Sequence, residues 1–550
     1  MKNKPSTSER VSPRSEPLPC GRPGPVVSME DEAHSGTVAE ASVTRRHLRG
    51  SSLLLAGRFL ALLLNFSAQI LTVRYLTKVD YGAFAYALAV VTMATSVNLL
   101  GLGRAVSRFV PIYHERGDYD SMFGTVILAV GSIVGCGLAL IVLAFGLEGA
   151  LGARVASDPL AVGLLLVLIA LAPLGALDRV FQGVVAALAS PRAVFFRRYV
   201  LGPSLRLAAI LIVLLVQGSV YLLATCYLVA GVLGVVIYVL ILHRVLRERG
   251  LFQRFHLKSV RLPVREIFGF GVPLLTTDVS LILKTTMAVL ILDHFRGAAE
   301  VADFRVVVPV AGLNLVVLQS FKILFMPAAS RLYERKDTVG LNDLYWQSAI
   351  WITVVTFPIF AACFFLAEPL TTWLFGDRYA TSHSPLVVLA IGSYFSAAAG
   401  LNTYALQVYA RVRFITCINV LTTLVGLTLN LYLIPRYGVM GAAIATTAAV
   451  VLHNVLNHAG LLWRTDIDFL QWRCWRVYLT VLVAVLTLSL VSALLDRSAA
   501  AMAVPIMVVL VVLVSVAVVR INRHSLHLEE TFPELARVPL LRRLFSMESR

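Results

Sequence analysis

The chain has 550 residues, of which 58% are hydrophobic and only 14% are charged, and its formal net charge is +17. A water-soluble globular protein of this size needs more polar surface than that, so the composition excludes one and makes the bilayer the expected solvent. The six cysteines stand singly, without the spacing of a zinc site or a disulfide framework, so we expect neither a metal nor a cofactor.

Residues 1–44 are rich in Pro, Ser and Glu and contain no apolar run, which predicts a disordered cytosolic tail rather than a cleavable signal peptide. Fourteen apolar segments of about 20 residues follow, the length that a helix needs to span a bilayer. They lie at 52–73, 82–103, 121–147, 159–181, 196–217, 219–243, 267–292, 303–328, 344–366, 385–410, 413–434, 438–463, 477–495 and 501–520. The sequence therefore predicts an all-α polytopic membrane protein with about fourteen transmembrane helices.

The basic residues are distributed unevenly between the two sets of alternating loops. With the N-terminus placed inside, 36 of the 48 Lys and Arg fall on inner segments, 7 on outer loops, and the remaining five within helices. Positive charge marks the cytosolic side, so both termini are expected there. Two inner segments, Arg244–Arg265 and Leu535–Phe545, interleave basic and apolar residues. We expect them either to lie on anionic headgroups as interfacial helices or only to set the topology.

An internal repeat relates the second predicted helix to the eighth. RFVPIYHERGDYD (Arg108–Asp120) and LFMPAASRLYERKD (Leu324–Asp337) both place a proline near the inner end, followed by a tyrosine and a charged turn. Such a repeat favours two six-helix halves of parallel topology, although a chance match of short membrane-edge segments is an alternative. The expected organisation is a tail at 1–44, an N-terminal bundle at 45–243, a basic linker at 244–266, a C-terminal bundle at 267–464, two extra helices at 465–521 and an amphipathic cytosolic tail at 522–550.

Four motifs in this order resemble the polysaccharide flippases of the multidrug/oligosaccharidyl-lipid/polysaccharide exporter superfamily. They are YLTKVDYGAFAYALA (Tyr75–Ala89), NLLGLGRAVSRFVP (Asn98–Pro111), EPLTTWLFGDRYATSHSPLVVLAIG (Glu368–Gly392) and, most specific, NLYLIPRYGVMGAAIATTAA (Asn430–Ala449). The resemblance covers about residues 45–465. It implies a fold like that of the multidrug and toxin extruders, with two six-helix bundles around a central cavity that opens alternately to each side. It also implies a lipid-linked oligosaccharide as substrate, the bacterial cytoplasmic membrane as location, and the polysaccharide polymerase and chain-length machinery as partners. Beyond these we expect contact with membrane lipids and not with nucleic acid.

Apart from those at span ends that are counted with the inner segments, five basic residues fall inside the apolar segments, where each costs at least about 2.5 kcal/mol on an insertion scale and so usually faces a cavity. They are Arg58, Arg206, Lys284, Arg305 and Lys322. A lumen lined by these cations would give a pyrophosphate charge-assisted hydrogen bonds in a region of low dielectric constant. Alternatives are that Arg58 extends to the inner interface, that Arg305 lies near the outer one, that Arg206 pairs with Asp178, and that Lys284 pairs with Asp278.

Uncharged polar residues share helix faces with several of these cations, since residues on a helix are 100° apart. Such residues can exchange hydrogen bonds with sugar hydroxyls, so we expect them to line the same lumen. They are Asn65 and Gln69 beside Arg58, Thr277 and Ser280 beside Lys284, Gln319 beside Arg305, and Asn419 and Asn430 on the eleventh helix.

Acidic residues are scarce within the predicted spans. Only Asp178 and Asp278 could bind a coupling ion, and this scarcity disfavours an exporter of cationic drugs. The twelfth helix carries four polar residues that could form a proton relay or, alternatively, hold helices together. They are His453, Asn454, Asn457 and His458.

The sequence thus favours a flippase that moves a polyprenyl-pyrophosphate-linked oligosaccharide outward for surface polysaccharide synthesis (O-antigen, capsule or exopolysaccharide). The alternatives are an ion-coupled small-molecule or multidrug antiporter of the same fold and a peptidoglycan lipid-precursor flippase. A membrane enzyme is disfavoured, because the longest outer loop, Glu368–Ser384, offers only Glu368 and Asp377 for acid–base chemistry.

Overall fold

The computed structural model describes residues 57–146, 158–188, 195–254, 259–465, 467–468, 472–495 and 500–526, and all regular secondary structure in these residues is helical. The predictions for the tail 1–44 and for Leu535–Phe545 lie outside this part of the chain. The first described helix covers residues 57–75. It is followed by α2 (Lys78–Leu99), α3 (Leu102–Glu115), α4 (Tyr119–Gly146), α6 (Pro159–Leu168), α7 (Leu171–Leu188), the π-helix η1 (Phe196–Leu201), α9 (Gly202–Val216), α10 (Val220–Glu248), the 3₁₀-helix η2 (Leu251–Arg254), α11 (Val264–Arg296), α12 (Ala298–Ala311), α13 (Leu313–Glu334), α14 (Thr338–Phe365), α15 (Ala367–Phe375), the 3₁₀-helix η3 (Asp377–Ser382), α16 (His383–Ala398), α17 (Asn402–Val408), α18 (Val412–Arg464), α19 (Trp472–Leu495), α20 (Ala500–Ile521) and α21 (Arg523–Leu526).

Eleven helices in the described ranges are long and apolar enough to cross a membrane. The longest of them, Val412–Trp463, has 52 residues and contains two of the predicted spans, because it bends at Gly438. These helices confirm the prediction of a polytopic all-α membrane protein. The count of fourteen crossings stays a prediction.

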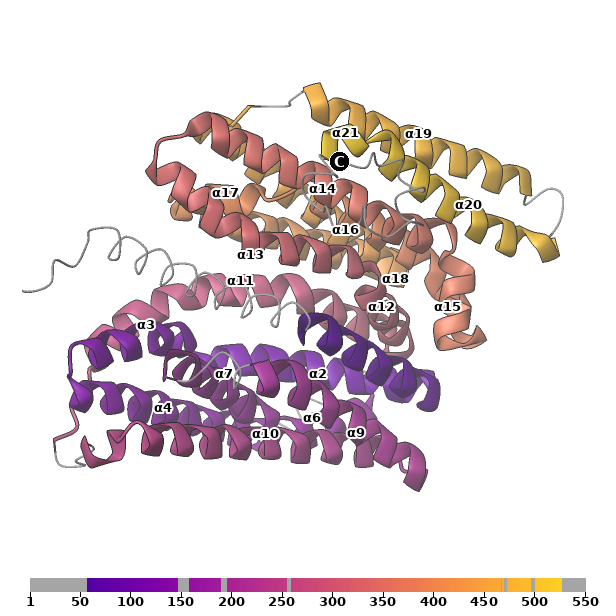
Figure 1. Ribbon diagram of the computed structural model, residues 1–550. Coiled ribbons are helices and arrows are strands. Elements are labelled where there is room, and N and C mark those ends of the chain that lie inside the picture. Colours follow the sequence, from indigo (N-terminus) through magenta and orange to yellow (C-terminus); the bar gives the residue numbers. More distant parts are fainter. Residues whose placement is uncertain are drawn as a thin grey trace, which may run out of the picture. The chain divides into compact units, whose positions relative to one another are not determined.

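The helices from α2 to α10 pack mainly on one another, and so do those from α11 to α18 (Figure 1). The two sets meet where α2 contacts α11 and α12, and where α3 contacts α11. The last two long helices, α19 and α20, pack against α14. The division into two six-helix halves with two extra helices stays a prediction.

The repeated segments adopt the same local structure. A proline lies inside α3 and inside α13, at Pro111 and Pro327. Each of these helices directly follows another, α2 and α12, after a break of one or two residues at Leu100–Gly101 and at Gly312. At the first break both residues have positive φ, 48° and 71°, which ends α2 and lets α3 start in a new direction. Each repeat therefore forms a helix pair rather than one straight span.

Small residues allow α2 and α12 to approach closely, as membrane helices often do. A Cβ atom added to Gly82 of α2 would overlap the backbone carbonyl of Ala298 at the start of α12. We therefore expect Gly82→Ala to destabilise the protein by about 1–3 kcal/mol, because backbone must move to make room. Gly131→Ala on α4 is the matched control, since nothing lies within 4 Å of its added Cβ. Thermal unfolding in detergent measures both; equal stability of the two variants would contradict the close contact.

The bend in α18 explains the most specific motif of the sequence. Gly438 adopts φ 54° and ψ −131°, a conformation that favours glycine. Pro435 precedes the bend, and its carbonyl accepts a hydrogen bond from Arg296 Nη2 at 2.9 Å. The Val439 N–H donates to Glu300 Oε2 at 3.0 Å. Side chains from α11 and α12 thus bind backbone groups on both sides of the bend, where helical hydrogen bonds are interrupted.

The basic linker is only partly described. Leu251 of η2 is buried in a hydrophobic cluster with residues of α3, α4 and α7, whereas Leu262 is exposed. Ser259 Oγ donates to Asp120 Oδ1 at 2.9 Å, and Tyr113 Oη donates to Glu266 Oε2 at 2.6 Å. The linker therefore packs on the ends of α3 and α4, and its binding to a membrane surface stays a prediction.

Candidate functional site

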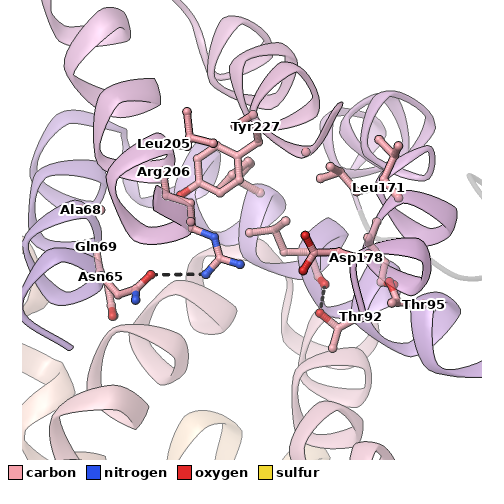
Figure 2. Close-up of a pocket in the computed structure, with 18 of the residues that line it drawn as sticks. Asn65, Ala68, Gln69, Thr92, Thr95, Leu171, Asp178, Leu205, Arg206 and Tyr227 are labelled. Carbon is pink, nitrogen blue, oxygen red and sulfur yellow. Dashed lines mark hydrogen bonds between the residues drawn. The ribbon is translucent and has the colours of Figure 1, made fainter. Parts of the chain in front are cut away.

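A cavity of about 580 Å³ lies among the helix at 57–75, α2, α7, α9 and α10. Its wall combines polar and apolar residues from all five helices with Arg197 of η1 and Arg305 of α12. The lining residues used below are Asn65, Gln69, Thr92, Thr95, Asp178, Arg179, Arg197, Arg206, Tyr227 and Arg305. We call this cavity the pocket; Figure 2 shows its interior.

Arg206 extends from α9 across the pocket toward the first helix (Figure 2). Its Nη1 donates a hydrogen bond to Asn65 Oδ1 at 3.3 Å, and much of its side chain is exposed to the cavity. One turn further along the first helix, Gln69 also lines the pocket and donates to the Val306 carbonyl of α12 at 3.4 Å. The polar stripe predicted on the first helix therefore faces this cavity at Asn65 and Gln69.

The pocket contains one carboxylate, and it is already paired. Asp178 of α7 forms an ion pair with Arg197 of η1, whose guanidinium is buried. Arg197 also donates to the Gly234 carbonyl at 3.3 Å and lies 4.7 Å above the ring of Tyr238. The π-helical geometry of η1 places this arginine toward α7 and α10 just before α9 begins, and π-helical turns often occur at functional sites.

Three further arginines leave the pocket with an excess of positive charge. Arg179, Arg206 and Arg305 line it, and none of them takes part in the ion pairs formed within the described residues. Guanidinium groups recognise phosphate oxygens by paired, charge-assisted hydrogen bonds. The nearby amides and the hydroxyls of Thr92 and Thr95 can hydrogen-bond to a neutral polar group. The arrangement can therefore hold an anion attached to a hydroxyl-rich molecule.

Three predicted lumen residues lie elsewhere, between the first helix and α13. Arg58 donates to Tyr199 Oη at 3.3 Å and to the Gln319 carbonyl at 3.4 Å. Gln319 Nε2 donates to Tyr404 Oη at 3.4 Å, and Lys322 Nζ lies 4.3 Å above the Tyr404 ring. None of these residues lines the pocket.

Lys284 also lies away from the pocket, between α11 and α18. Its Nζ is 3.1 Å from Asn419 Oδ1 and 3.4 Å from His453 Nδ1. One turn away, Thr423 Oγ1 lies 3.5 Å from the carbonyl of Ser280. The eleventh-helix stripe predicted from Asn419 therefore faces α11 rather than the pocket.

The remaining predicted polar residues serve local contacts or cannot be placed. Asn430 donates to the Gly426 carbonyl of its own helix at 2.7 Å. Asn454 donates to Ser396 Oγ at 3.2 Å, which fits a role in holding helices together, and His458 lies beside Trp346. The helix backbone at Thr277 is described, but its side chain lies outside the described part of the structure.

Both alternative ion pairs suggested by the sequence are wrong. Asp178 pairs with Arg197 instead of Arg206, and Asp278 pairs with Arg104 of α3 instead of Lys284. Arg179 and Arg197 stand at the inner ends of the predicted spans 159–181 and 196–217 and were counted with the inner basic residues, so the sequence reasoning missed them as pocket residues. The available signal was an acid–base pair split across consecutive antiparallel spans, with Asp178 near the end of one and Arg197 at the start of the next.

No group of three or more His, Cys, Asp or Glu side chains that could hold a metal ion occurs in the described ranges. Asp178 and Asp278 each form an ion pair with an arginine. Their roles in binding a coupling ion stay predictions.

At one end of the helices, several polar contacts join the two helix sets. Arg378 of η3 donates to the carbonyls of Val73 and Arg74 at 2.6 and 2.7 Å. Arg74 in turn donates to the Leu374 carbonyl at 2.9 Å. Lys78 forms an ion pair with Asp303 at 2.7 Å. These contacts close the end that the charge distribution predicts to be outer.

The model of the family described as "Polysaccharide biosynthesis protein" matches residues 47–333. The "Probable low-salt glycan biosynthesis flippase Agl15" of Haloferax volcanii is 21% identical over 193 residues, which are 35% of this chain and 41% of that protein. Among solved structures, a lipid II flippase MurJ in an inward closed conformation superposes with a TM-score of 0.66 at 14% identity, covering 86% of this chain and 99% of that one. A multidrug resistance MATE family transporter in an inward-facing conformation gives a TM-score of 0.60 at 15% identity, over 75% and 97%. The predicted MATE-like fold is thereby confirmed.

Proposed function

Because the chain belongs to the polysaccharide biosynthesis protein family, we propose that it is a flippase for a polyprenyl-pyrophosphate-linked oligosaccharide. The substrate would move from the cytoplasmic to the outer leaflet of a bacterial inner membrane and serve the assembly of a surface polysaccharide. The likeness to solved flippases and multidrug transporters concerns the fold alone, so it supports a transporter rather than an enzyme without identifying the cargo.

The observation that carries this proposal is the excess of three arginines in the pocket. A pyrophosphate is costly to remove from water, and Arg206, Arg305 and Arg179 together supply the donors that replace its hydration. Asn65, Gln69 and the pocket threonines would contact the sugars next to it. The same charge pattern disfavours a cationic drug as cargo, because the one pocket carboxylate is already paired with Arg197.

Transport by alternating access needs the contacts between the two helix sets to open. The Lys78–Asp303 ion pair and the hydrogen bonds from Arg378 would break when the pocket opens toward the predicted outer side. The contacts of α3 with α11, among them the Arg104–Asp278 pair, lie at the opposite, predicted inner end. The orientation with both termini in the cytosol is part of this proposal.

Cells that lack the gene should lose the surface polysaccharide and accumulate its lipid-linked repeat unit in the inner leaflet, because synthesis continues while export stops. Mass spectrometry of extracted lipids and staining of surface glycan measure the two effects. Accumulation of the peptidoglycan lipid precursor instead would identify a flippase for that substrate. Unchanged lipid-linked sugars together with greater drug sensitivity would contradict the proposal in favour of a drug antiporter.

A further inference from the structure

A second polar cluster lies where α11 meets both arms of α18. Lys284 of α11 contacts Asn419 on the arm at 412–437, and it contacts His453 on the arm at 439–464. His453 in turn contacts Asn457. We call these four residues the Lys284 cluster. Lys284 takes part in no ion pair within the described residues, so an ammonium group here would have no carboxylate partner.

The hydrogen bonds of the cluster determine which atoms carry hydrogen. Asn457 Nδ2 donates to the backbone carbonyl of His453 at 2.9 Å, and a carbonyl oxygen can only accept, so this contact identifies the amide nitrogen. The same nitrogen lies 3.0 Å from His453 Nε2. Its second hydrogen is therefore directed at Nε2, which must act as an acceptor.

A neutral imidazole has one donor and one acceptor nitrogen. With Nε2 accepting, His453 Nδ1 carries the hydrogen and donates it toward Lys284 Nζ, 3.4 Å away. Nζ can accept this bond only with a lone pair, which an amine has and an ammonium lacks. At the same time Nζ donates to Asn419 Oδ1 at 3.1 Å. All three side-chain contacts of the cluster are hydrogen bonds with one donor and one acceptor when Lys284 is an uncharged amine.

We propose that Lys284 is a proton-binding site, and that it takes up and releases one proton in each cycle of the transport proposed above, on which this inference rests. In the protonation step the Nδ1 proton of His453 passes along its hydrogen bond to the Nζ lone pair, so the N–H bond at Nδ1 breaks as one forms at Nζ, and the amine becomes an ammonium. The ammonium then donates to Asn419 Oδ1 and to His453 Nδ1. A proton from the aqueous phase bonds to His453 Nε2, so the imidazole stays neutral with its hydrogen on the other nitrogen, and the cluster has gained one proton in total.

The structure provides an acceptor for the altered imidazole. Asn457 Oδ1 is buried and has no hydrogen-bond partner within the described residues. A turn of this amide would bring Oδ1 to the His453 Nε2–H, at the cost of the hydrogen bond that Asn457 Nδ2 donates to the His453 carbonyl in the neutral cluster. The two protonation states therefore differ in the orientation of Asn457 as well as in the charge of Lys284, and such a difference in structure is what a protonation switch requires.

The charged groups around the cluster are engaged elsewhere. Along α11, Asp278 lies about 9 Å from Lys284 by helix rise and pairs with Arg104, while Asp293 lies about 13 Å away in the other direction. On α12, Asp303 pairs with Lys78, and Arg305 lines the pocket. The charged residues of α2 and α4 stand in the first turns of those helices, and the only ionisable contact from α18 is His453. Among the described residues, therefore, no acid forms an ion pair with Lys284 that would hold its proton permanently.

The cluster is placed to influence the pocket. The first part of α11 contacts α3 through Asp278 and Glu266, whereas the part around Lys284 contacts α18. After a single residue, Gly297, α11 leads into α12, which carries Arg305. A charge gained at Lys284 changes how α11 binds α18, and the movement reaches the pocket through α12.

Flipping by the full-length protein in proteoliposomes, with the membrane potential clamped, tests this inference. Wild type should flip a labelled lipid-linked oligosaccharide about 10-fold faster when an inward proton gradient is imposed. Lys284→Met should flip it at the rate that wild type shows without a gradient, and an imposed gradient should not increase that rate. Lys284→Arg, which cannot lose its charge, should behave in the same way.

Lys322→Met is the matched control, because it removes an intramembrane lysine outside the cluster, and it should keep the 10-fold response. His453→Gln provides a second variant should Lys284→Met fail to fold in size-exclusion chromatography, and it should also lose the response. A wild type that flips without a gradient response, or a Lys284→Met or His453→Gln variant that keeps it, would overturn the inference and leave the proposed function standing. A wild type that flips no substrate under any gradient would overturn the proposed function itself.

Discussion

Replacing both Arg206 and Arg305 by alanine is expected to weaken the binding of a polyprenyl pyrophosphate by about 1,000-fold while the protein stays folded. Each arginine lines the pocket without a carboxylate partner within the described residues, so its guanidinium is available to the phosphate oxygens. A hydrogen bond to a charged group is worth about 2 kcal/mol, which is about 30-fold for each residue. The two effects multiply if the residues act independently.

Isothermal titration of the purified protein with a short-chain polyprenyl pyrophosphate measures this change. Arg244→Ala is the matched control, because Arg244 is an exposed arginine at the end of α10 that pairs only with Glu248 on the same helix. That variant should bind as the wild type does. Arg206→Lys should retain part of the affinity, since it keeps the charge but loses the paired geometry. Equal binding by wild type and the double alanine variant would exclude the pocket as the pyrophosphate site.

Replacing Arg197 by alanine is expected to destabilise the protein by about 2 kcal/mol rather than to weaken binding alone. Arg197 is buried and holds Asp178, so its removal leaves a carboxylate at the pocket wall without its partner. Breaking a buried ion pair typically costs about 3–5 kcal/mol. The Asp178 side chain is 33% exposed, so water reaches it and reduces that cost.

Thermal unfolding in detergent of Arg197→Ala, Asp178→Asn and the double variant measures the coupling between the two residues. The double variant should be more stable than Arg197→Ala, because it no longer leaves a charge unpaired. Arg198→Ala is the control, since the neighbouring arginine is exposed, lies 5.5 Å from the Tyr199 ring and forms no ion pair within the described residues. If Arg197→Ala and Arg198→Ala unfold at the same temperature, the ion pair does not stabilise the fold.

Hydropathy predicted the helices well because crossing a bilayer requires a long apolar helix whatever its neighbours are. Hydropathy did not predict the breaks within two of the apolar runs. The interruption at Leu100–Gly101 and the one at Gly312 lie inside stretches that read as continuous spans. The bend at Gly438 could be anticipated more easily, because a proline and a glycine stand three residues apart there.

The candidate site was predicted only in part, because a helical wheel gives the faces of one helix but not the helix that each face meets. Asn65 and Gln69 share a face with Arg58, yet Arg58 lies about two turns from Asn65 and contacts Tyr199 outside the pocket. Lys284 is a charged residue within an apolar helix, as a residue that lines a lumen would be, but α18 packs on the face of α11 that carries it. Arg197 was counted with the inner basic residues because it stands at the very start of the span 196–217, and only the packing of α7 against α10 shows that it is buried.

Flipping of a fluorescent polyprenyl-pyrophosphate oligosaccharide by the purified protein in proteoliposomes tests the central claim most directly. Chemical quenching of the fluorophore in the outer leaflet reports how much substrate has crossed. We expect the wild type to equilibrate the substrate between leaflets, and the Arg206→Ala/Arg305→Ala variant to do so no faster than protein-free liposomes. Equal flipping by the wild type and this variant, or none by the folded wild type, would contradict a lipid-linked oligosaccharide flippase that works through an arginine-lined pocket.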